Sequence, residues 1–253
     1  MMAGKKQLLS CAAFAATLCL APLSGGVAQA ASRRAAPPPP APHTLAYRVI
    51  HMRGSLSFRA HGPAVRLLQD ELARRRYEVP VNGYFDEATG RAVLAFRKVC
   101  GLERIESANA GVFQLLRKGV GRFHVRYPGD GNHIEADLSK QVLVEVERGG
   151  RVRRIYTMSS GKPSTPTVLG RFRVYSKTPG TNSEGMVDSN YFIRGYAIHG
   201  YAEVPSYAAS HGCLRIPIPD APAVFAWVQL GYPVNIYTDD GQGSRVVRND
   251  AGP

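Results

Sequence analysis

The sequence predicts an α+β chain with a small three-helix domain followed by a mainly β domain whose sheet is sandwich- or barrel-like. Two patterns support this fold class. Between about residues 61 and 118, apolar residues recur at the spacing of a helix face. From residue 133 onward, short alternating runs are separated by glycine- and proline-rich turns, with one late helical stretch.

The first 30 of the 253 residues have the features of a secretory signal peptide. Lys5 and Lys6 precede an apolar run over residues 8–23, and Ala28-Gln29-Ala30 forms a small-x-small cleavage site. A retained single-pass anchor is the alternative. The cleavage site, and the Pro, Ser and Gly beside the apolar run, favour cleavage.

Five further segments are expected after the signal peptide. A proline-rich linker over residues 31–60 carries four consecutive prolines, which favour an extended tether. It is followed by the helical domain (residues 61–120), a second linker (121–132), the β domain (133–238) and a polar, disordered tail (239–253).

Three helices are expected in the helical domain. The first begins near Pro63, which suits a first turn, and has apolar residues on one face over residues 65–72. The second follows Asp86, the expected N-cap, and ends at Gly101. The third includes residues 112–116.

In the β domain, alternation places Val142, Val144 and Val146 on one face of a strand. The stretches 159–167 and 178–189 are rich in breakers and are predicted to be loops. A helix is expected over residues 220–230. Further strands are expected at residues 133–137, 151–158, 170–177, 191–193, 196–199 and 233–237.

Charge and cysteine content limit the possible partners. The net charge of +13 suits a polyanion, but the arginines are scattered and no nucleic-acid motif appears, so nucleic acid is not expected as a partner. Outside the signal segment only Cys100 and Cys213 remain, far apart, so no disulfide framework is expected. No Cys/His spacing suits a metal, and no metal or other cofactor is expected.

Reactive residues concentrate between His199 and Arg215. A thiol is a good nucleophile only as the thiolate, and an imidazole can take its proton, so Cys213 is the candidate nucleophile. His211 is nearer in sequence, but residues two apart on an extended stretch tend to point to opposite faces. His199 arrives from a separate strand and is free to face the sulfur. His211 is then either a structural or an electrostatic neighbour of the thiol.

The same stretch contains groups that are expected to stabilise or bind negative charge. Backbone N–H groups of Gly212 and Cys213 are the expected oxyanion donors. Ser210 is expected to brace the loop by hydrogen bonding. Arg215 either binds a substrate carboxylate or ties the loop down.

The reactive stretch resembles the signature of the L,D-transpeptidases, the YkuD-type catalytic domain. The resemblance rests on His-Gly at residues 199–200 and Ser-His-Gly-Cys-Leu-Arg at residues 210–215, and it covers roughly residues 133–238. It implies that His199 is the general base and that the backbone carbonyl of Gly200 orients the imidazole. It also suggests Met186 and Tyr191 as pocket-wall residues.

Two tyrosines between the histidines, Tyr201 and Tyr207, are expected to line the cleft for the donor peptide. Glu203, the nearest carboxylate, is expected at the surface or facing the substrate.

The helical part resembles the type 1 peptidoglycan-binding domain. The matching residues are Leu-Leu-Gln-Asp-Glu-Leu at 67–72, Gly-Tyr-Phe-Asp at 83–86, Ala-Val-Leu-Ala-Phe at 92–96 and Gly-Leu at 101–102. Arg97 departs from the family, which usually has Gln there. Because these are core and turn residues, they identify a fold rather than ligand contacts.

Together the resemblances imply a secreted enzyme whose partners are peptidoglycan stem peptides and glycan. Cys213 would attack the diaminopimelate carbonyl of a donor stem and release D-Ala. A side-chain amine of a neighbouring stem would then take the acyl group, giving a 3–3 cross-link. Carbapenems commonly acylate members of this family, so Cys213 is an expected drug target.

The enzyme is expected beyond the cytoplasmic membrane, in the cell wall or periplasm, and would meet that membrane only transiently through its signal peptide. Two alternatives remain open. An L,D-carboxypeptidase would hydrolyse the thioester and trim stems. A non-catalytic wall-binding protein is disfavoured by the intact His199 and Cys213.

Overall fold

The structure is a computed structural model that describes residues 54–240 of the chain. The predicted signal peptide, most of the proline-rich linker and most of the predicted tail lie outside the described residues. Within the described part, no helix is both long and apolar enough to cross a membrane.

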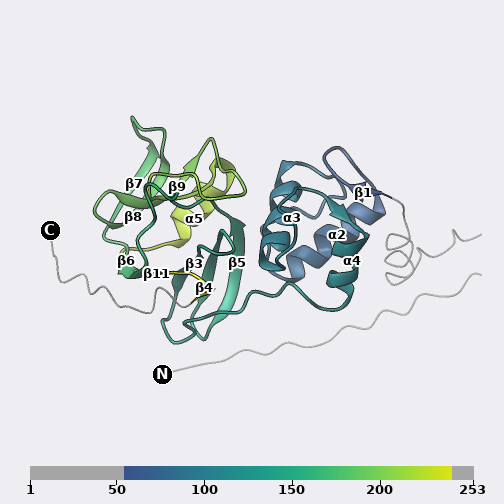
Figure 1. Cartoon of the computed structure of the whole chain (residues 1–253), viewed down its shortest axis with the longest axis horizontal. Coiled ribbons are helices and arrows are strands. Elements are labelled where there is room, and N and C mark those ends of the chain that lie inside the picture. The colour runs from purple at the N-terminus through teal and green to yellow at the C-terminus, as the bar shows by residue number, and fades with distance from the viewer. Residues whose placement is uncertain (1–53, 241–253) are drawn as a thin grey trace, which may run out of the picture. The chain divides into compact units, whose positions relative to one another are not determined.

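The N-terminal part of the described chain contains three helices: α2 (Pro63–Arg74), α3 (Glu87–Val99) and α4 (Ala110–Arg117) (Figure 1). The predicted start signals are confirmed. Pro63 lies in the first turn of α2. Asp86 caps α3, because its carboxylate accepts a hydrogen bond from the Thr89 N–H at 2.8 Å.

Residues 55–60, which the sequence places in the linker, pair with the helical domain instead. β1 (Ser55–Leu56) runs antiparallel to β2 (Ala108–Asn109). The Arg59 N–H also donates to the Phe85 carbonyl at 2.9 Å. A two-residue strand has no periodicity, so the sequence pattern gave no sign of it.

Gln69 is a fully buried amide that fixes the turn before α3. Its Nε2 donates to Asn82 Oδ1 at 3.1 Å, to the Tyr84 carbonyl at 2.9 Å and to Thr89 Oγ1 at 2.9 Å. Its Oε1 accepts from the N–H groups of Asn82 at 3.0 Å and Gly83 at 2.8 Å. One side chain therefore satisfies several buried polar groups at once.

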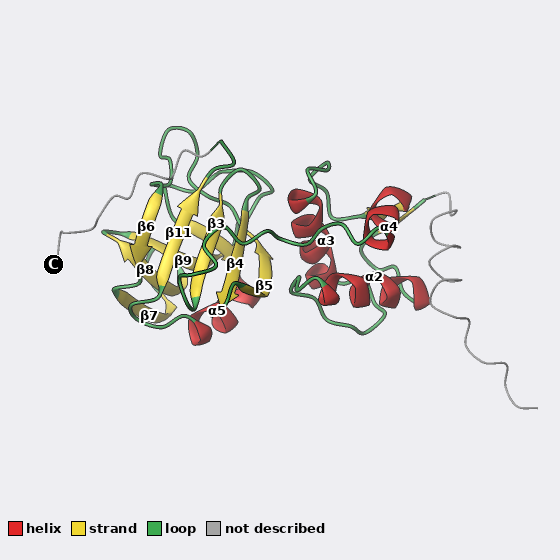
Figure 2. Ribbon diagram, turned by 90° about the horizontal axis from the view of Figure 1, so that it is seen from below, coloured by secondary structure: helices red, strands yellow, loops and turns green. Residues whose placement is uncertain are grey.

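The C-terminal part contains two sheets and one α-helix, and Figure 2 shows these strands in yellow. The five-stranded sheet has the order β5 (Arg151–Thr157), β4 (Val142–Glu147), β3 (His133–Asp137), β11 (Pro233–Tyr237), β6 (Gly170–Arg173). The four-stranded sheet has the order β10 (Leu214–Pro217), β9 (Tyr196–Tyr201), β8 (Val187–Ile193), β7 (Ser176–Thr181). A 3₁₀ turn, Ile218–Asp220, leads into α5 (Ala221–Trp227).

One apolar core joins the two sheets. Ile134 and Leu143 of the five-stranded sheet, Phe192 and Ile198 of the four-stranded sheet, and Val224 of α5 all belong to it, and all are fully buried. The expected α+β class, a small helical domain followed by a mainly β domain with a sandwich-like core, is confirmed.

Strand β4 is buried on both faces. Leu143 faces the core between the sheets. Val142, Val144 and Val146, which the alternation placed on one face, join a second core together with Phe96 of α3. The helical domain thus packs on the second face of the five-stranded sheet and removes it from water.

Two expectations for the β domain are wrong. The stretch 178–189 is largely strand, because β7 and β8 pair across it. Its breakers Pro179 and Gly180 fall where the register between the strands shifts, and so they interrupt no regular ladder. The helix expected over 220–230 ends at Trp227.

We expect Gln69→Leu to lower the free energy of unfolding by roughly 2–4 kcal/mol, because several buried donors and acceptors lose their partner. Urea denaturation followed by circular dichroism measures this. Gln114→Leu, at an exposed glutamine of α4, is the matched control and should change stability by less than about 0.5 kcal/mol. Equal stability of the two variants would contradict the role assigned to Gln69.

Candidate active site

Parallel pairing of β9 with β10 brings the two ends of the reactive stretch together. In the register, His199 lies opposite Arg215. Cys213 directly precedes β10, so it lies beside Ala197 of β9. Two parallel neighbours need a long connection, and residues 202–213 provide it.

A cavity of about 300 Å³ opens at this point. It is lined by Glu184, Met186, His199, Tyr201, Ser210, His211, Cys213 and Arg215. All of these except Glu184 are among the site residues predicted from the sequence.

A larger cavity of about 480 Å³ lies beside Glu87, Arg91 and Glu106, and it shares only Tyr201 with the first. Its lining includes no thiol and no imidazole. The smaller cavity is therefore the one equipped for nucleophilic chemistry.

His199 is buried, and its Nδ1 lies 3.0 Å from the carbonyl oxygen of Gly200. A carbonyl oxygen only accepts, so Nδ1 carries the proton and Nε2 of the neutral ring keeps its lone pair. The ring also meets Tyr201 edge-on, with 5.7 Å between ring centroids. The imidazole is thus held in the tautomer that a general base requires.

The thiol of Cys213 is half-buried at the cavity wall, with Sγ 3.7 Å from the Gly195 carbonyl oxygen. Burial raises the pKa of this thiol, and hydrogen bonding from the Ala197 backbone and the charge of Arg215 offset part of that rise. The negative charge of Glu184 adds to it. The net shift disfavours the thiolate form of Cys213.

Burial also lowers the pKa of His199. The hydrogen bond to Gly200 opposes this shift, whereas the positive charge of Arg215 adds to it. Both shifts disfavour a preformed thiolate–imidazolium pair. The thiol would therefore lose its proton as it attacks, and His199, which lines the same cavity, is the candidate acceptor.

Ser210 braces the loop as expected, but it also occupies one of the predicted oxyanion donors. Its Oγ donates to the Cys213 carbonyl at 2.6 Å and accepts from the Gly212 N–H at 3.0 Å. The expectation that the Gly212 N–H is free to bind an oxyanion is therefore not met in this loop conformation. A short serine turn satisfies that donor first.

Two glycines of the site have no room for a side chain. Gly212 has φ of +123°, and a Cβ there would overlap the ring of Tyr196. At Gly200 a Cβ would lie 2.7 Å from that of Ala221. Close backbone packing, rather than flexibility, is what these positions require.

His211 and Arg215 take different places around the thiol. His211 is exposed, and its Nε2 lies 3.3 Å from Nζ of Lys162. The guanidinium carbon of Arg215 lies 4.0 Å from the ring centroid of Tyr201. The Arg215 backbone also exchanges hydrogen bonds with Ser159 at 2.9 and 3.0 Å. Arg215 thus ties the loop down and still presents its charge to the cavity.

Tyr191 and Tyr207, both predicted to bind substrate, do not line the cavity. Tyr191 lies farther along β8, and its ring centroid is 6.4 Å from that of Tyr175. Tyr207 has 62% of its surface exposed. The prediction for Tyr191 rested on the family resemblance upstream of His-Gly, and that for Tyr207 rested on its place between the two histidines.

Glu184 lines the cavity but is not among the site residues predicted from the sequence. It lies in a turn in which Asn182 Oδ1 accepts from the N–H groups of Glu184 at 3.0 Å and Met186 at 2.9 Å. The sequence signal was an asparagine followed by serine, glutamate and glycine, which marks a turn but not its partner.

No group of three or more His, Cys, Asp or Glu residues in the described part of the chain is arranged to hold a metal ion.

Comparison with known families gives two matches. Residues 131–236 match the model of the L,D-transpeptidase catalytic domain (YkuD). Residues 61–104 match that of a putative peptidoglycan binding domain. No curated protein matches the sequence.

Solved structures extend the comparison. An L,D-transpeptidase from Xylanimonas cellulosilytica is 31% identical, with a TM-score of 0.69, and the match covers 74% of this chain and 98% of that one. One from Stackebrandtia nassauensis is 18% identical, with a TM-score of 0.45 and coverage of 74% and 94%. LdtMt1, solved with imipenem, is 26% identical, with a TM-score of 0.36 and coverage of 43% and 60%.

We expect alkylation of Cys213 by iodoacetamide to accelerate steadily as pH rises past the ordinary thiol value of about 8.5, because the raised pKa keeps the thiolate scarce at neutral pH. Rates measured by peptide mass spectrometry test this. Cys100 is an internal control, since burial raises its pKa to about 11 and it should react more slowly. A rate independent of pH between about 5 and 7 would instead reveal a preformed thiolate–imidazolium pair.

Proposed function

The chain belongs to the L,D-transpeptidase family, whose members are cysteine transpeptidases acting on peptidoglycan, and we propose that it is secreted and forms 3–3 cross-links through an acyl-thioester on Cys213. The observation that carries the proposal is the pairing of chemistries in one cavity. A thiol and an imidazole of fixed tautomer line the same 300 Å³ space.

The first half-reaction acylates the enzyme. As Sγ of Cys213 attacks the diaminopimelate carbonyl of a donor stem, its proton passes to Nε2 of His199. The tetrahedral intermediate then collapses, the C–N bond to D-Ala breaks, and the leaving amine takes the proton from His199. A thioester on Cys213 remains.

The second half-reaction transfers the acyl group. The side-chain amine of an acceptor stem attacks the thioester carbonyl and gives its proton to His199. The C–S bond breaks, an amide forms, and the proton returns to the sulfur of Cys213. No oxidant, metal or nucleotide enters this balance.

Negative charge on the carbonyl oxygen needs a donor in both half-reactions. We assign the Cys213 N–H to this role, because the Gly212 N–H is engaged by Ser210. A donor of this kind contributes on the order of 3 kcal/mol to lowering the barrier. Gly212 joins only if the loop turns its N–H away from Ser210 Oγ.

The charged residues of the cavity suit the ends of the substrates. Arg215 is placed to bind a carboxylate of the donor stem. Glu184 is exposed and, among residues 54–240, is the only carboxylate lining the cavity. We assign it to the acceptor, whose amine arrives as an ammonium ion and must be drawn to the thioester before it loses its proton.

Secretion and wall attachment complete the proposal. Secretion rests on the signal features of residues 1–30 and places the enzyme in the cell wall or periplasm. The helical domain is proposed to hold the enzyme on peptidoglycan, in keeping with its match to a putative peptidoglycan binding domain. Carbapenems are proposed to acylate Cys213.

Purified protein from Ala31 onward, incubated with a disaccharide-tetrapeptide, should give a dimer that lacks one D-Ala. Mass spectrometry detects it, and Cys213→Ala should give none, because the thioester cannot form. A monomeric tripeptide alone would establish the carboxypeptidase instead. If no stem chemistry gives a product that depends on Cys213, the alternative of a non-catalytic wall-binding protein is favoured.

Glu184→Gln should lower the ratio of dimer to tripeptide several-fold while D-Ala release stays near the wild-type rate, because only the step that uses the acceptor loses its ion pair. The same mass-spectrometric assay reads both products. Glu203→Gln, at an exposed carboxylate that does not line the cavity, is the control. Equal ratios in the two variants would remove Glu184 from acceptor binding.

A further inference from the structure

Lys98, on the last turn of α3, points out of its own helix into the β domain. Only 2% of the residue is exposed. Its Nζ donates to the Gln141 carbonyl at 3.0 Å, to Thr157 Oγ1 at 2.7 Å and to the Met158 carbonyl at 3.0 Å. Three acceptors match the three N–H bonds of an ammonium group.

Holding an ammonium group here costs free energy. Burial, followed by repulsion from Arg104, lowers the pKa of Lys98, and Glu106 opposes the shift only in part. An apolar side chain of similar length would avoid that cost, but it would leave three buried acceptors without a donor. The lysine therefore holds these three groups in place, and their position in the chain indicates what it stabilises.

Those acceptors adjoin residues 159–160, which hydrogen-bond to the reactive loop and its flank. The reactive loop is the connection between β9 and β10, residues 202–213. Ser159 follows Met158 and exchanges backbone hydrogen bonds with Arg215. The Ser160 N–H donates to Gln141 Oε1 at 2.8 Å. Arg215, two residues after Cys213, is thus held by the residue that follows an acceptor of Lys98.

The Ser160 carbonyl completes the link on the other side of Cys213. It accepts from the N–H groups of Ala209 at 2.8 Å and Ser210 at 2.9 Å. Ser210 in turn holds the Cys213 carbonyl through its Oγ. An unbroken series of hydrogen bonds and adjacent residues runs from α3 to the residue that attacks the substrate.

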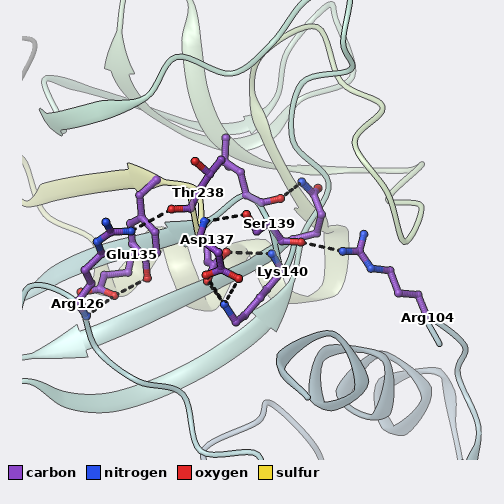
Figure 3. A network of polar contacts seen from close by, with 11 residues as sticks. Arg104, Arg126, Glu135, Asp137, Ser139, Lys140 and Thr238 are labelled. Atoms are coloured by element: carbon purple, nitrogen blue, oxygen red, sulfur yellow. Dashed lines mark hydrogen bonds and ion pairs between the residues drawn. The ribbon is translucent and has the colours of Figure 1, made fainter. Parts of the chain in front are cut away.

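Arg104 makes a second attachment to the same loop. Its Nη1 donates to the Ser206 carbonyl at 2.9 Å and its Nη2 to the Ser139 carbonyl at 2.8 Å. Figure 3 shows Arg104 extended toward Ser139, beside the contact of Lys140 with Asp137. The Lys140 N–H and Nζ both donate to Asp137 at 2.9 Å, so Arg104 holds a turn that is itself fixed.

We propose that the helical domain positions the reactive loop for acyl transfer, with Lys98 and Arg104 as the two positioning residues. The inference rests on the proposed transpeptidase function for its catalytic consequence, but its structural part does not. Neither residue lines the catalytic cavity. Lys98 and Arg104 therefore act on Cys213 through the hydrogen-bonded backbone that holds the reactive loop, and not by contact with the cavity.

The structural part is tested by hydrogen exchange on the full-length protein, read by mass spectrometry over residues 202–216. Lys98→Met and Arg104→Ala should each exchange faster than wild type in this stretch. Lys118→Met, at an exposed lysine of the same domain, should exchange as wild type does. Arg104 is exposed, so its variant decides the matter if Lys98→Met does not fold.

The catalytic part is tested by the rate at which imipenem acylates Cys213, measured with kcat and KM for the stem peptide. Misplacement by about 1 Å costs up to a hundredfold, so we expect a fall of roughly ten- to a hundredfold in acylation and kcat, with KM nearly unchanged. A merely stabilising role would lower the melting temperature and leave these rates intact.

Three outcomes are distinguishable. Faster exchange with slower acylation supports the proposal. Wild-type exchange and acylation in both variants overturn it. If wild-type protein itself shows no Cys213-dependent chemistry, the proposed function fails, and the exchange data still decide whether the helical domain holds the loop.

Discussion

The parallel register between β9 and β10 is the constraint on which the site depends. It sets His199 opposite Arg215 and places Cys213 at the entrance of the second strand. A slip by one residue would turn the imidazole to the other face of the sheet and away from the sulfur. A further bridge holds β10 in this position. Ser159 pairs with Arg215 along the edge of β10 that faces away from β9.

The helical domain and the β domain are therefore joined by shared packing as well as by the chain between them. Strand β4 contributes to the core between the sheets on one face and to the helical core on the other. In the loop after β5, the Met158 carbonyl accepts a hydrogen bond from Lys98. The next two residues hydrogen-bond to the backbone on both sides of Cys213. The packing of the helical domain on the five-stranded sheet is therefore linked to the ordering of the reactive loop.

What the sequence could predict follows from how local each signal is. Helix starts at Pro63 and Asp86 depend on neighbouring residues, and they were predicted correctly. His199 and Cys213 were predicted to share one site from a motif with a set spacing. That spacing corresponds to the connection between β9 and β10. Register shifts and cross-strand neighbours depend on residues far away in the chain. For that reason the strand nature of residues 178–189, the place of Tyr191 and the approach of Glu184 were beyond the reach of sequence patterns.

The partner that orients His199 is a main-chain carbonyl, that of Gly200. In sites where a carboxylate side chain does this work, one codon change removes it. Here no codon change removes the oxygen, and any residue larger than glycine meets Ala221 before it can alter the strand. Sequence drift can therefore reshape the rim of the cavity, and with it the choice of substrate or inhibitor. The tautomer of His199 persists for as long as β9 keeps its path.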